Sequence, residues 1–322
     1  MSPESWRIPI TVTSGSLALI LNLLLACIIL ASKCSYVGKY KWLLFLYTVS
    51  AAVYAVAQIL IAGNFFMCLD GYMFYDTLRI LPVAVDAFVS CFIQNVIILT
   101  LSFFYRYYVV CNPHGLDHFL RNWLPISLFS ILIITYEMVV LVNAMMPSSV
   151  AEEVLDESFF LETGFHVNET AYIGAIIFVH SHLNWELLLG LGSFVAFISI
   201  FGGIIVTLAV KIGKALKGSS IESETMAKNQ KKIFILLIFQ LSLPLLFNII
   251  PLQIVVLSTY FRLRTELLVN SLGCILSFAQ VIDPILIFFF IKPYRLALLG
   301  WLLKKKTPVH SVPSPPPEQQ IP

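Results

Sequence analysis

Residues 186–210 read ELLLGLGSFVAFISIFGGIIVTLAV, and Glu186 is the one charged side chain among them. A bilayer core about 30 Å thick requires roughly 20 predominantly apolar residues to cross as a helix. A transmembrane β-strand would instead be about 10 residues long and would alternate apolar and polar side chains, which this stretch does not do. We therefore predict a membrane-spanning helix, which satisfies its own backbone polar groups within the hydrocarbon.

Six further segments have the same character. They are Ile8–Ala31, Trp42–Gly63, Leu81–Tyr105, Trp123–Met146, Ile233–Leu257 and Leu267–Ile291. Across all 322 residues, 59% are hydrophobic and 12% are charged, whereas soluble domains carry about 25% charged residues. Residues 1–306 are therefore expected to form one membrane domain without a separate soluble domain. The predicted fold class is an all-α bundle of seven transmembrane helices.

Lys and Arg predict the orientation of the bundle. All but four of the 20 Lys and Arg residues fall on the side that carries the C-terminus, and the exceptions are Arg7, Arg79, Arg262 and Arg264. Short loops rich in Lys and Arg stay in the cytoplasm, so the N-terminus is predicted to be outside and the C-terminus inside. The loop 147–185 agrees, because it is acidic, lacks Lys and Arg, and carries the glycosylation acceptor Asn168-Glu169-Thr170.

Both ends of the chain carry further signals. The first apolar run is followed by Lys33, Lys39 and Lys41 rather than by a cleavage site, so we predict a signal anchor that stays in the membrane. Residues 292–306 combine Lys and Arg with Leu and Trp, which indicates a short amphipathic helix on the anionic inner leaflet. Residues 307–322 are rich in proline and are expected to be disordered.

The cysteines do not suggest an outer disulfide. Cys68 is the one cysteine expected outside, and the loop 147–185 contains none. We therefore predict free thiols and no disulfide between that loop and the third helix.

Polar side chains inside the predicted helices are costly and point to function. Those in the outer half form a pool of ligand-binding candidates: Asp86, Ser90, Gln94, Asn248, Gln253 and Asn270. Aromatic residues that could line an apolar pocket with them are Phe65, Phe66, Phe88, Phe92, Phe194 and Phe247. The amides could equally serve as interhelical hydrogen-bond partners. The carboxyl groups of Asp86, Glu137 and Asp283 must be paired, hydrated or protonated.

The sixth helix carries two prolines on one face. Gln240, Pro244, Asn248 and Pro251 follow steps of three or four residues, which place them on the same side of a helix. Because proline removes a backbone hydrogen bond and kinks a helix, the outer half of this helix could lean and open a cavity.

Two motifs stand at the inner membrane edge. Phe104-Tyr105-Arg106-Tyr107-Tyr108 ends the third helix, and Asp283-Pro284 followed by Lys292-Pro293-Tyr294-Arg295 closes the seventh. Arg106 could be a membrane anchor or part of a conformational switch, and the two interpretations remain open.

These motifs resemble, in order and spacing, the nematode Str-type seven-helix chemoreceptors. The resemblance also rests on Gly38-Lys39-Tyr40-Lys41-Trp42-Leu43-Leu44, on Cys111-Asn112-Pro113 and on Ile250-Pro251, and it covers nearly the whole chain. It implies a G protein-coupled receptor for small, often volatile chemicals in the cilium of a chemosensory neuron. It also implies that Arg106 contacts the G protein or holds the resting state, and that Asp283, Pro284 and Tyr294 form a switch. Tyr105 stands where many rhodopsin-like receptors carry an acidic residue.

The sequence favours a receptor of the plasma membrane over other functions. A transporter is disfavoured by the odd number of helices and the lack of a visible repeat, while a ligand-gated channel remains an alternative. No histidine falls inside a predicted helix, which argues against an intramembrane metalloenzyme. We therefore expect no catalytic residue, metal or cofactor. The expected partners are a small odorant, a heterotrimeric G protein and the lipid bilayer, but not nucleic acid.

Overall fold

The computed structural model describes residues 4–32, 39–61, 65–76, 81–145, 147–218, 224–263 and 266–302. Its long helices are α1 (Glu4–Ala31), α2 (Tyr40–Ile61), α3 (Leu81–Cys111), α5 (Trp123–Met145), α7 (Trp185–Gly218), α8 (Glu224–Pro244), α9 (Ile250–Tyr260) and α10 (Glu266–Phe290). Shorter helices and turns are η1 (Pro113–Gly115), α4 (Leu116–Arg121), α6 (Ser149–Thr163), η2 (Val167–Glu169), η3 (Leu245–Ile249) and α11 (Lys292–Leu302). The strands are β1 (Phe65–Met67), β2 (Gly71–Asp76), β3 (Ala171–Ile176), β4 (Phe178–Val179) and β5 (His182–Leu183).

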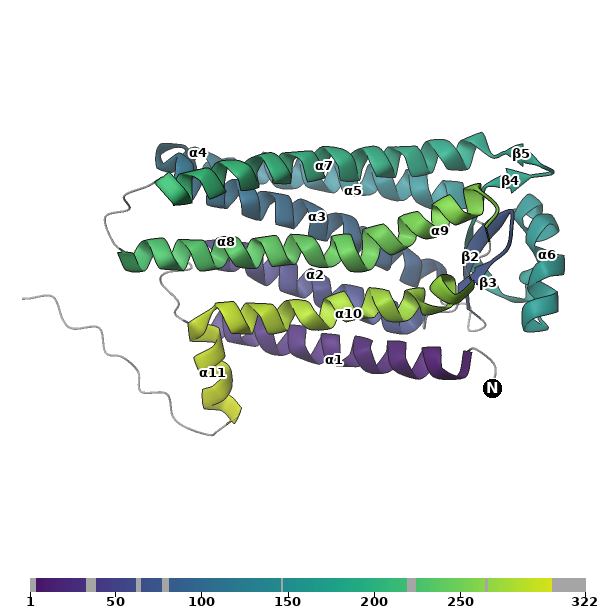
Figure 1. Ribbon diagram of the computed structural model, residues 1–322, viewed down its shortest axis with the longest axis horizontal. Coiled ribbons are helices and arrows are strands. Elements are labelled where there is room, and N and C mark those ends of the chain that lie inside the picture. The colour runs from purple at the N-terminus through teal and green to yellow at the C-terminus, as the bar shows by residue number, and fades with distance from the viewer. Residues whose placement is uncertain are drawn as a thin grey trace, which may run out of the picture.

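Long helices running side by side form the body of the molecule (Figure 1). Six helical spans in the described residues are long and apolar enough to cross a membrane, and they come from α1, α2, α3, α5, α7 and the continuous unit α8–η3–α9. A shorter apolar helix, Phe278–Phe290, lies within α10. Together these elements confirm the predicted seven-helix bundle.

The packing of the bundle fits a hydrocarbon environment. On α5, large apolar side chains such as Leu128, Leu132 and Val139 face outward, as lipid contact permits. Small residues let helices approach closely: a Cβ on Gly15 of α1 would lie 2.7 Å from Cγ1 of Ile59 on α2. Helix α3 contacts α2, α5, α7 and α8, so it lies at the centre of the bundle.

The sixth crossing is irregular where the sequence places its prolines. Helix α8 ends at Pro244, the π-helical turn η3 follows, and α9 begins just before Pro251. Proline has no amide hydrogen, so Pro251 cannot bond the carbonyl of Phe247, and the wider turn occurs there. The helical unit bends at this point (Figure 1). Such π-turns occur frequently at functional sites.

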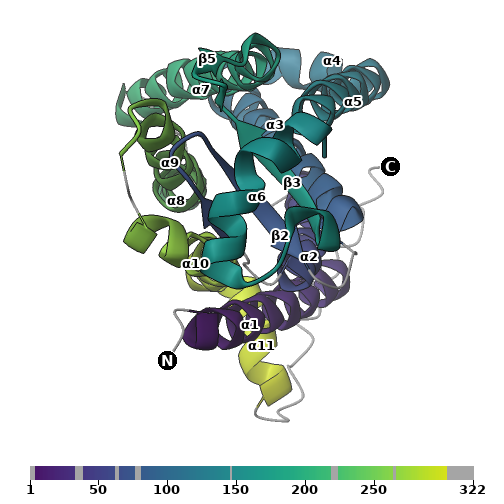
Figure 2. The same cartoon turned by 90° about the vertical axis from the view of Figure 1, so that its right-hand side faces the viewer.

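A small cap covers the outer end of the bundle. Strands β1, β2 and β3 form an antiparallel sheet in that order, and α6 packs against it, with the ring of Phe159 edge-on to those of Phe66 and Tyr75 at 5.2 and 4.9 Å. Figure 2 looks onto α6, β2 and β3 lying across the end of the bundle. No pattern in the sequence predicts this sheet or α6. The all-α prediction therefore describes the membrane part, to which the structure adds an outer cap.

Polar contacts join the cap to the bundle. The Asp70 carbonyl accepts hydrogen bonds from the amides of Ile177 and Phe178 at 2.8 and 3.0 Å. The Asp70 carboxylate pairs with Arg262 Nη2 at 3.1 Å, and the Arg262 guanidinium lies 4.5 Å from the Phe178 ring centroid. Cys68, the cysteine that the structure describes at this end, is free, and burial raises the pKa of its thiol. These contacts, rather than a disulfide, join the described parts of the outer end.

At the inner end, α11 turns away from the bundle axis directly after α10 (Figure 1). It occupies most of the segment 292–306 that was predicted to be an amphipathic helix. Lys292, Arg295, Leu299 and Trp301 are exposed, whereas Tyr294 is fully buried against the bundle. Residues 303–306 and the proline-rich tail 307–322 lie outside the described residues.

Candidate functional site

A cavity of about 130 Å³, which we call the outer cavity, lies inside the bundle beneath the cap. Helices α2, α3, α5, α7 and α10, the α8–η3–α9 unit and strand β2 all contribute to its wall. The lining residues are Tyr54, Tyr72, Phe88, Val89, Phe92, Leu141, Met145, Leu191, Phe194, Ile198, Asn248, Ile249, Gln253 and Leu276. The wall is therefore apolar and aromatic, with a few polar groups, as is typical of small-molecule sites.

Two of the predicted ligand-binding residues, Asn248 and Gln253, line the outer cavity, together with the predicted aromatic residues Phe88, Phe92 and Phe194. Ser90 and Gln94 do not line it. Phe88 and Phe92 are four residues apart on one face of α3, and Ser90 and Gln94 lie about half a turn away around that helix.

The remaining predicted residues lie elsewhere. The backbones of Asp86 and Asn270 belong to α3 and α10, but their side chains are outside the described part of the structure, as is the side chain of Phe65. Phe66 packs within the cap. Phe247 lies in η3 but is not among the residues that line the outer cavity.

Two tyrosines of the outer cavity were missed by sequence reasoning. Tyr54 lies on α2, where its ring stacks on that of Phe88 at 4.5 Å. Tyr72 lies on β2 and is buried beneath the cap. No pattern in the sequence marks either residue, because their roles depend on how α2 and the outer sheet pack against the bundle.

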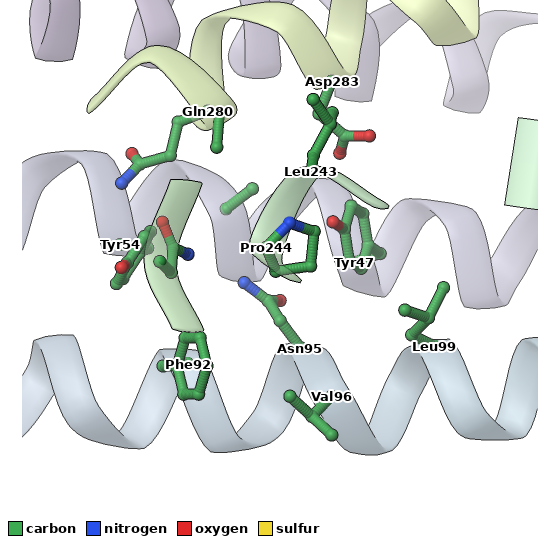
Figure 3. Close-up of a pocket in the computed structure, with 13 residues that line it drawn as sticks. Tyr47, Tyr54, Phe92, Asn95, Val96, Leu99, Leu243, Pro244, Gln280 and Asp283 are labelled. Atoms are coloured by element: carbon green, nitrogen blue, oxygen red, sulfur yellow. The ribbon is translucent and has the colours of Figure 1, made fainter. Parts of the chain in front are cut away.

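Figure 3 shows the residues that line a second, smaller cavity of about 50 Å³, which we call the inner cavity. It adjoins the outer cavity, because the two share lining residues. Tyr54, Phe92 and Asn248 line both cavities. The inner cavity is more polar, because Tyr47, Asn95, Gln280 and Asp283 also line it. The two cavities together lead from the cap towards the middle of the bundle.

The predicted switch residue Asp283 is 5% exposed. Tyr47 and Gln240 both interact with its carboxyl group. One turn earlier on α10, Gln280 Nε2 donates a hydrogen bond to Gln58 Oε1 of α2. Asp283 and Gln280 therefore belong to a polar layer that joins α2, α8 and α10.

Pro284, predicted to act with Asp283, is buried within α10. Asn22 of α1 reaches the same layer, because its Nδ2 lies 3.5 Å from the Gln280 carbonyl oxygen. Elsewhere in the bundle, the buried Glu137 of α5 accepts a hydrogen bond from Ser193 of α7 at 3.4 Å.

Arg106 lies at the inner end of α3 and is 2% exposed. Its Nη1 donates a hydrogen bond to Gln230 Oε1 of α8 at 2.8 Å. Its guanidinium lies 4.4 Å from the ring centroid of Tyr40 and 5.6 Å from that of Tyr105. Arg106 therefore joins α2, α3 and α8, and Tyr294 of α11 belongs to the same buried cluster as Tyr40 and Tyr105.

One helical unit connects these three layers. Along α8–η3–α9, Gln230 bonds Arg106, Gln240 interacts with Asp283, and Asn248 lines both cavities. The π-turn, which contains Asn248, lies between Gln253 at the outer cavity and Gln230 at Arg106. This unit therefore forms a continuous connection between the outer cavity and the inner end of the bundle.

The outer loop presents a different set of groups. Asn168, predicted to be glycosylated, is exposed in η2, and its glycosylation stays a prediction. Beside it, Asp156 accepts hydrogen bonds from the Val167 amide at 2.8 Å and from His166 Nδ1 at 2.9 Å. The Val167 and His166 bonds lower the pKa of Asp156, and the bond to Asp156 raises the pKa of His166.

These two shifts set the pH range in which the Asp156–His166 contact is strongest. The raised pKa means that the His166 contribution is complete below about pH 6.5, the ordinary histidine value, and is lost as pH rises through the raised value. The lowered pKa means that the Asp156 contribution is complete above about pH 4 and is lost as pH falls through the lowered value. The contact therefore stabilises the outer loop most between about pH 4 and 6.5.

Comparison with known proteins agrees with this architecture. Residues 8–299 match the family model of the serpentine type seven-transmembrane G protein-coupled chemoreceptor Str. No match to a curated protein was found. The match covers every helix of the bundle together with the outer cap, the two cavities and the residues around Arg106. The chain therefore belongs to the Str family of serpentine seven-transmembrane G protein-coupled chemoreceptors.

Proposed function

We propose that this receptor binds a small, largely apolar chemical in the outer cavity and passes the signal to a heterotrimeric G protein at its inner face. The observation that carries the proposal is that a single helical unit, α8–η3–α9, supplies Asn248 to the cavity and Gln230 to Arg106. Ligand binding and the inner contact are thereby properties of one structural element.

The volume of the outer cavity supports a small ligand. A protein cavity of about 150 Å³ lined by apolar side chains binds benzene, and the outer cavity measures about 130 Å³. A ligand with a body close to benzene in size therefore fills it. The aromatic walls at Phe88, Phe92 and Phe194 favour apolar or aromatic compounds, which is consistent with a volatile odorant.

Activation follows from the difference in ligand affinity between two conformations. A ligand shifts the equilibrium only as far as its affinities for the two states differ. In our proposal the ligand favours an arrangement in which α9 moves at the π-turn and α8 withdraws from α3. Arg106 then loses Gln230 and, with the basic residues of 211–232, meets the Gα subunit.

The family resemblance supports the remaining parts of the proposal. We propose a receptor that acts in the plasma membrane of a nematode chemosensory neuron, in the cilium, with a role in olfaction. Asn168 would carry a glycan on the outer face, where it is exposed.

A screen of small odorants on cells that express this chain with a promiscuous Gα subunit tests the proposal. We expect calcium responses to some compounds, and loss of those responses when the Gα subunit is absent. Arg106→Gln should abolish the response while leaving surface expression intact. Ligand-evoked currents that persist without any G protein would refute the proposal in favour of a channel.

A matched pair of variants tests the ligand site. Leu276→Trp should fill the outer cavity and abolish the response, because Leu276 lines it. Leu128→Trp should leave the response unchanged, because Leu128 faces outward from α5. A full response from the Leu276→Trp receptor would show that the ligand binds elsewhere.

A further inference from the structure

The two joined cavities contain more hydrogen-bond acceptors than the surrounding protein satisfies. Among the described side chains that line them, four buried oxygens have no hydrogen-bond partner in the protein: Asn95 Oδ1, Asn248 Oδ1, Gln280 Oε1 and Asp283 Oδ1. The buried hydroxyl of Tyr54 also has none. Buried polar groups are rarely left without a partner, so this concentration of them at one place is informative.

These groups are mainly hydrogen-bond acceptors. An amide oxygen and an ionised carboxylate accept hydrogen bonds and cannot donate them, while a tyrosine hydroxyl can do both. Asn95, Asn248 and Gln280 each present an oxygen that can only accept, and the Asp283 carboxyl group keeps oxygen lone pairs that accept in either protonation state. The described lining of both cavities includes no Lys, Arg or His. The unpartnered oxygens there therefore favour a ligand group that donates a hydrogen bond.

The boundary between the cavities is where a ligand can use these acceptors. Tyr54 and Asn248 line both cavities, and Asn248 is 8% exposed. An apolar ligand body in the outer cavity would therefore direct a terminal polar group towards Asn248 Oδ1, with the more polar inner cavity beyond it. A terminal hydroxyl could donate to Asn248 and accept from Tyr54, whereas a carbonyl could only accept.

We infer that the ligand of this receptor is a small apolar molecule that carries a hydrogen-bond donor at one end, such as an alcohol or an amine, rather than a carbonyl compound or a hydrocarbon. The inference rests on the proposed function of the outer cavity as the ligand site. A hydroxyl and an ammonium group share this chemistry, and the experiment below distinguishes them.

The test uses two series of compounds matched in size: benzyl alcohol, benzylamine, benzaldehyde and toluene, and 1-hexanol, hexylamine, hexanal and hexane. Binding to the purified full-length receptor in lipid nanodiscs is measured by competition and by thermal shift, and signalling is measured in cells. We expect the alcohol or the amine of a series to bind at least about tenfold more tightly than its carbonyl and hydrocarbon counterparts, because only a donor satisfies the buried acceptor. Preference for the amine would identify an ammonium group, and preference for the alcohol a hydroxyl.

Two variants test which side chain causes the preference for hydrogen-bond donors. Asn248→Leu removes the acceptor, and Tyr54→Phe removes the hydroxyl while keeping the ring that stacks on Phe88. Asn248→Leu should bring the donor compounds to within about threefold of their carbonyl counterparts, whereas Tyr54→Phe leaves the acceptor in place and should keep the preference for donors. Asn248→Asp carries the test if Asn248→Leu does not reach the cell surface, because it keeps an acceptor at this position and adds a negative charge, which should raise the affinity for the amine relative to the other members of its series. Ile198→Val is the control: it shortens the apolar wall and should change the affinity for all four members of a series by a similar factor.

The outcomes separate the inference from the proposed function. Carbonyl compounds that bind as tightly as alcohols and amines, or a donor preference that survives Asn248→Leu, would overturn the inference while leaving the outer cavity as the ligand site. If no member of either series binds the receptor, the proposed ligand site fails and the inference fails with it.

Discussion

The hydrogen bond between Arg106 and Gln230 offers the sharpest test of how the inner end is held closed. Gln230→Leu keeps roughly the same side-chain volume and removes the oxygen that accepts from Arg106 Nη1 at 2.8 Å. A hydrogen bond to a charged group contributes about 1.5–3 kcal/mol. Gln230 is half-buried, so we expect the lower end of this range.

Loss of the free energy of this hydrogen bond should produce a measurable change in basal signalling. A loss of about 1.5 kcal/mol multiplies the ratio of active to resting receptor by roughly 10. If about 1% of resting receptors are active, the variant should raise that share to about 10%. The assay is ligand-free cyclic-nucleotide or calcium signalling, normalised to receptor at the cell surface.

Two further variants complete this test. Gln230→Glu should lower basal signalling below that of the wild type, because an ion pair with Arg106 is stronger than the neutral hydrogen bond. Asn229→Ala, one position away on α8, is the control and should behave like the wild type. Unchanged or reduced basal signalling in Gln230→Leu would refute the view that this contact holds the resting state.

Three other predictions concern the cap and the outer loop. Gly71→Ala should lower the thermal midpoint of the purified receptor, at a cost of about 1–3 kcal/mol, because the new Cβ would lie 2.7 Å from the Ala175 carbonyl oxygen. The control Gly192→Ala should leave the midpoint unchanged, because no atom lies within 4 Å of its Cβ. Equal midpoints for the two variants would contradict the register of β2 and β3. His166→Gln should lower the thermal midpoint relative to the wild type near pH 5.5, because the Asp156 bond raises the pKa of His166. The difference between the two midpoints should disappear near pH 8, where His166 is neutral. A difference that grows with pH would contradict the raised pKa. Asn168→Gln should abolish the shift in electrophoretic mobility that a glycosidase produces on the wild type, and a shift that remains would exclude Asn168 as the glycan site.

The sequence predicts the membrane part of the fold well because hydrocarbon imposes a simple requirement. Each crossing must be long, apolar and helical, so the segment 186–210 and its six counterparts can be recognised without any knowledge of their neighbours. The irregularity of the sixth crossing is also local, since a proline lacks its amide hydrogen wherever it lies. Pro244 and Pro251 therefore mark the position of η3 in advance.

The outer cap could not be predicted in the same way. Strand β2 pairs with both β1 and β3, and β3 lies almost a hundred residues further along the chain. Each strand is short, and pairing between strands so far apart in sequence depends on the bundle that brings them together. The small sheet and α6 thus follow from tertiary packing rather than from local sequence signals.

For the candidate site, too, the sequence determines some features and tertiary packing determines the others. Sequence alone determined that polar groups such as Asn248 and Asp283 lie inside the membrane, because their residue types stand out against apolar neighbours. Only the tertiary structure decided which of them meet, because the rotation of each helix about its axis is set by packing against other helices. That rotation turns Phe92 towards the cavities and Ser90 away from them, places Tyr54 beside Asn248 at the boundary, and brings Gln230 to Arg106 across the inner end of the bundle.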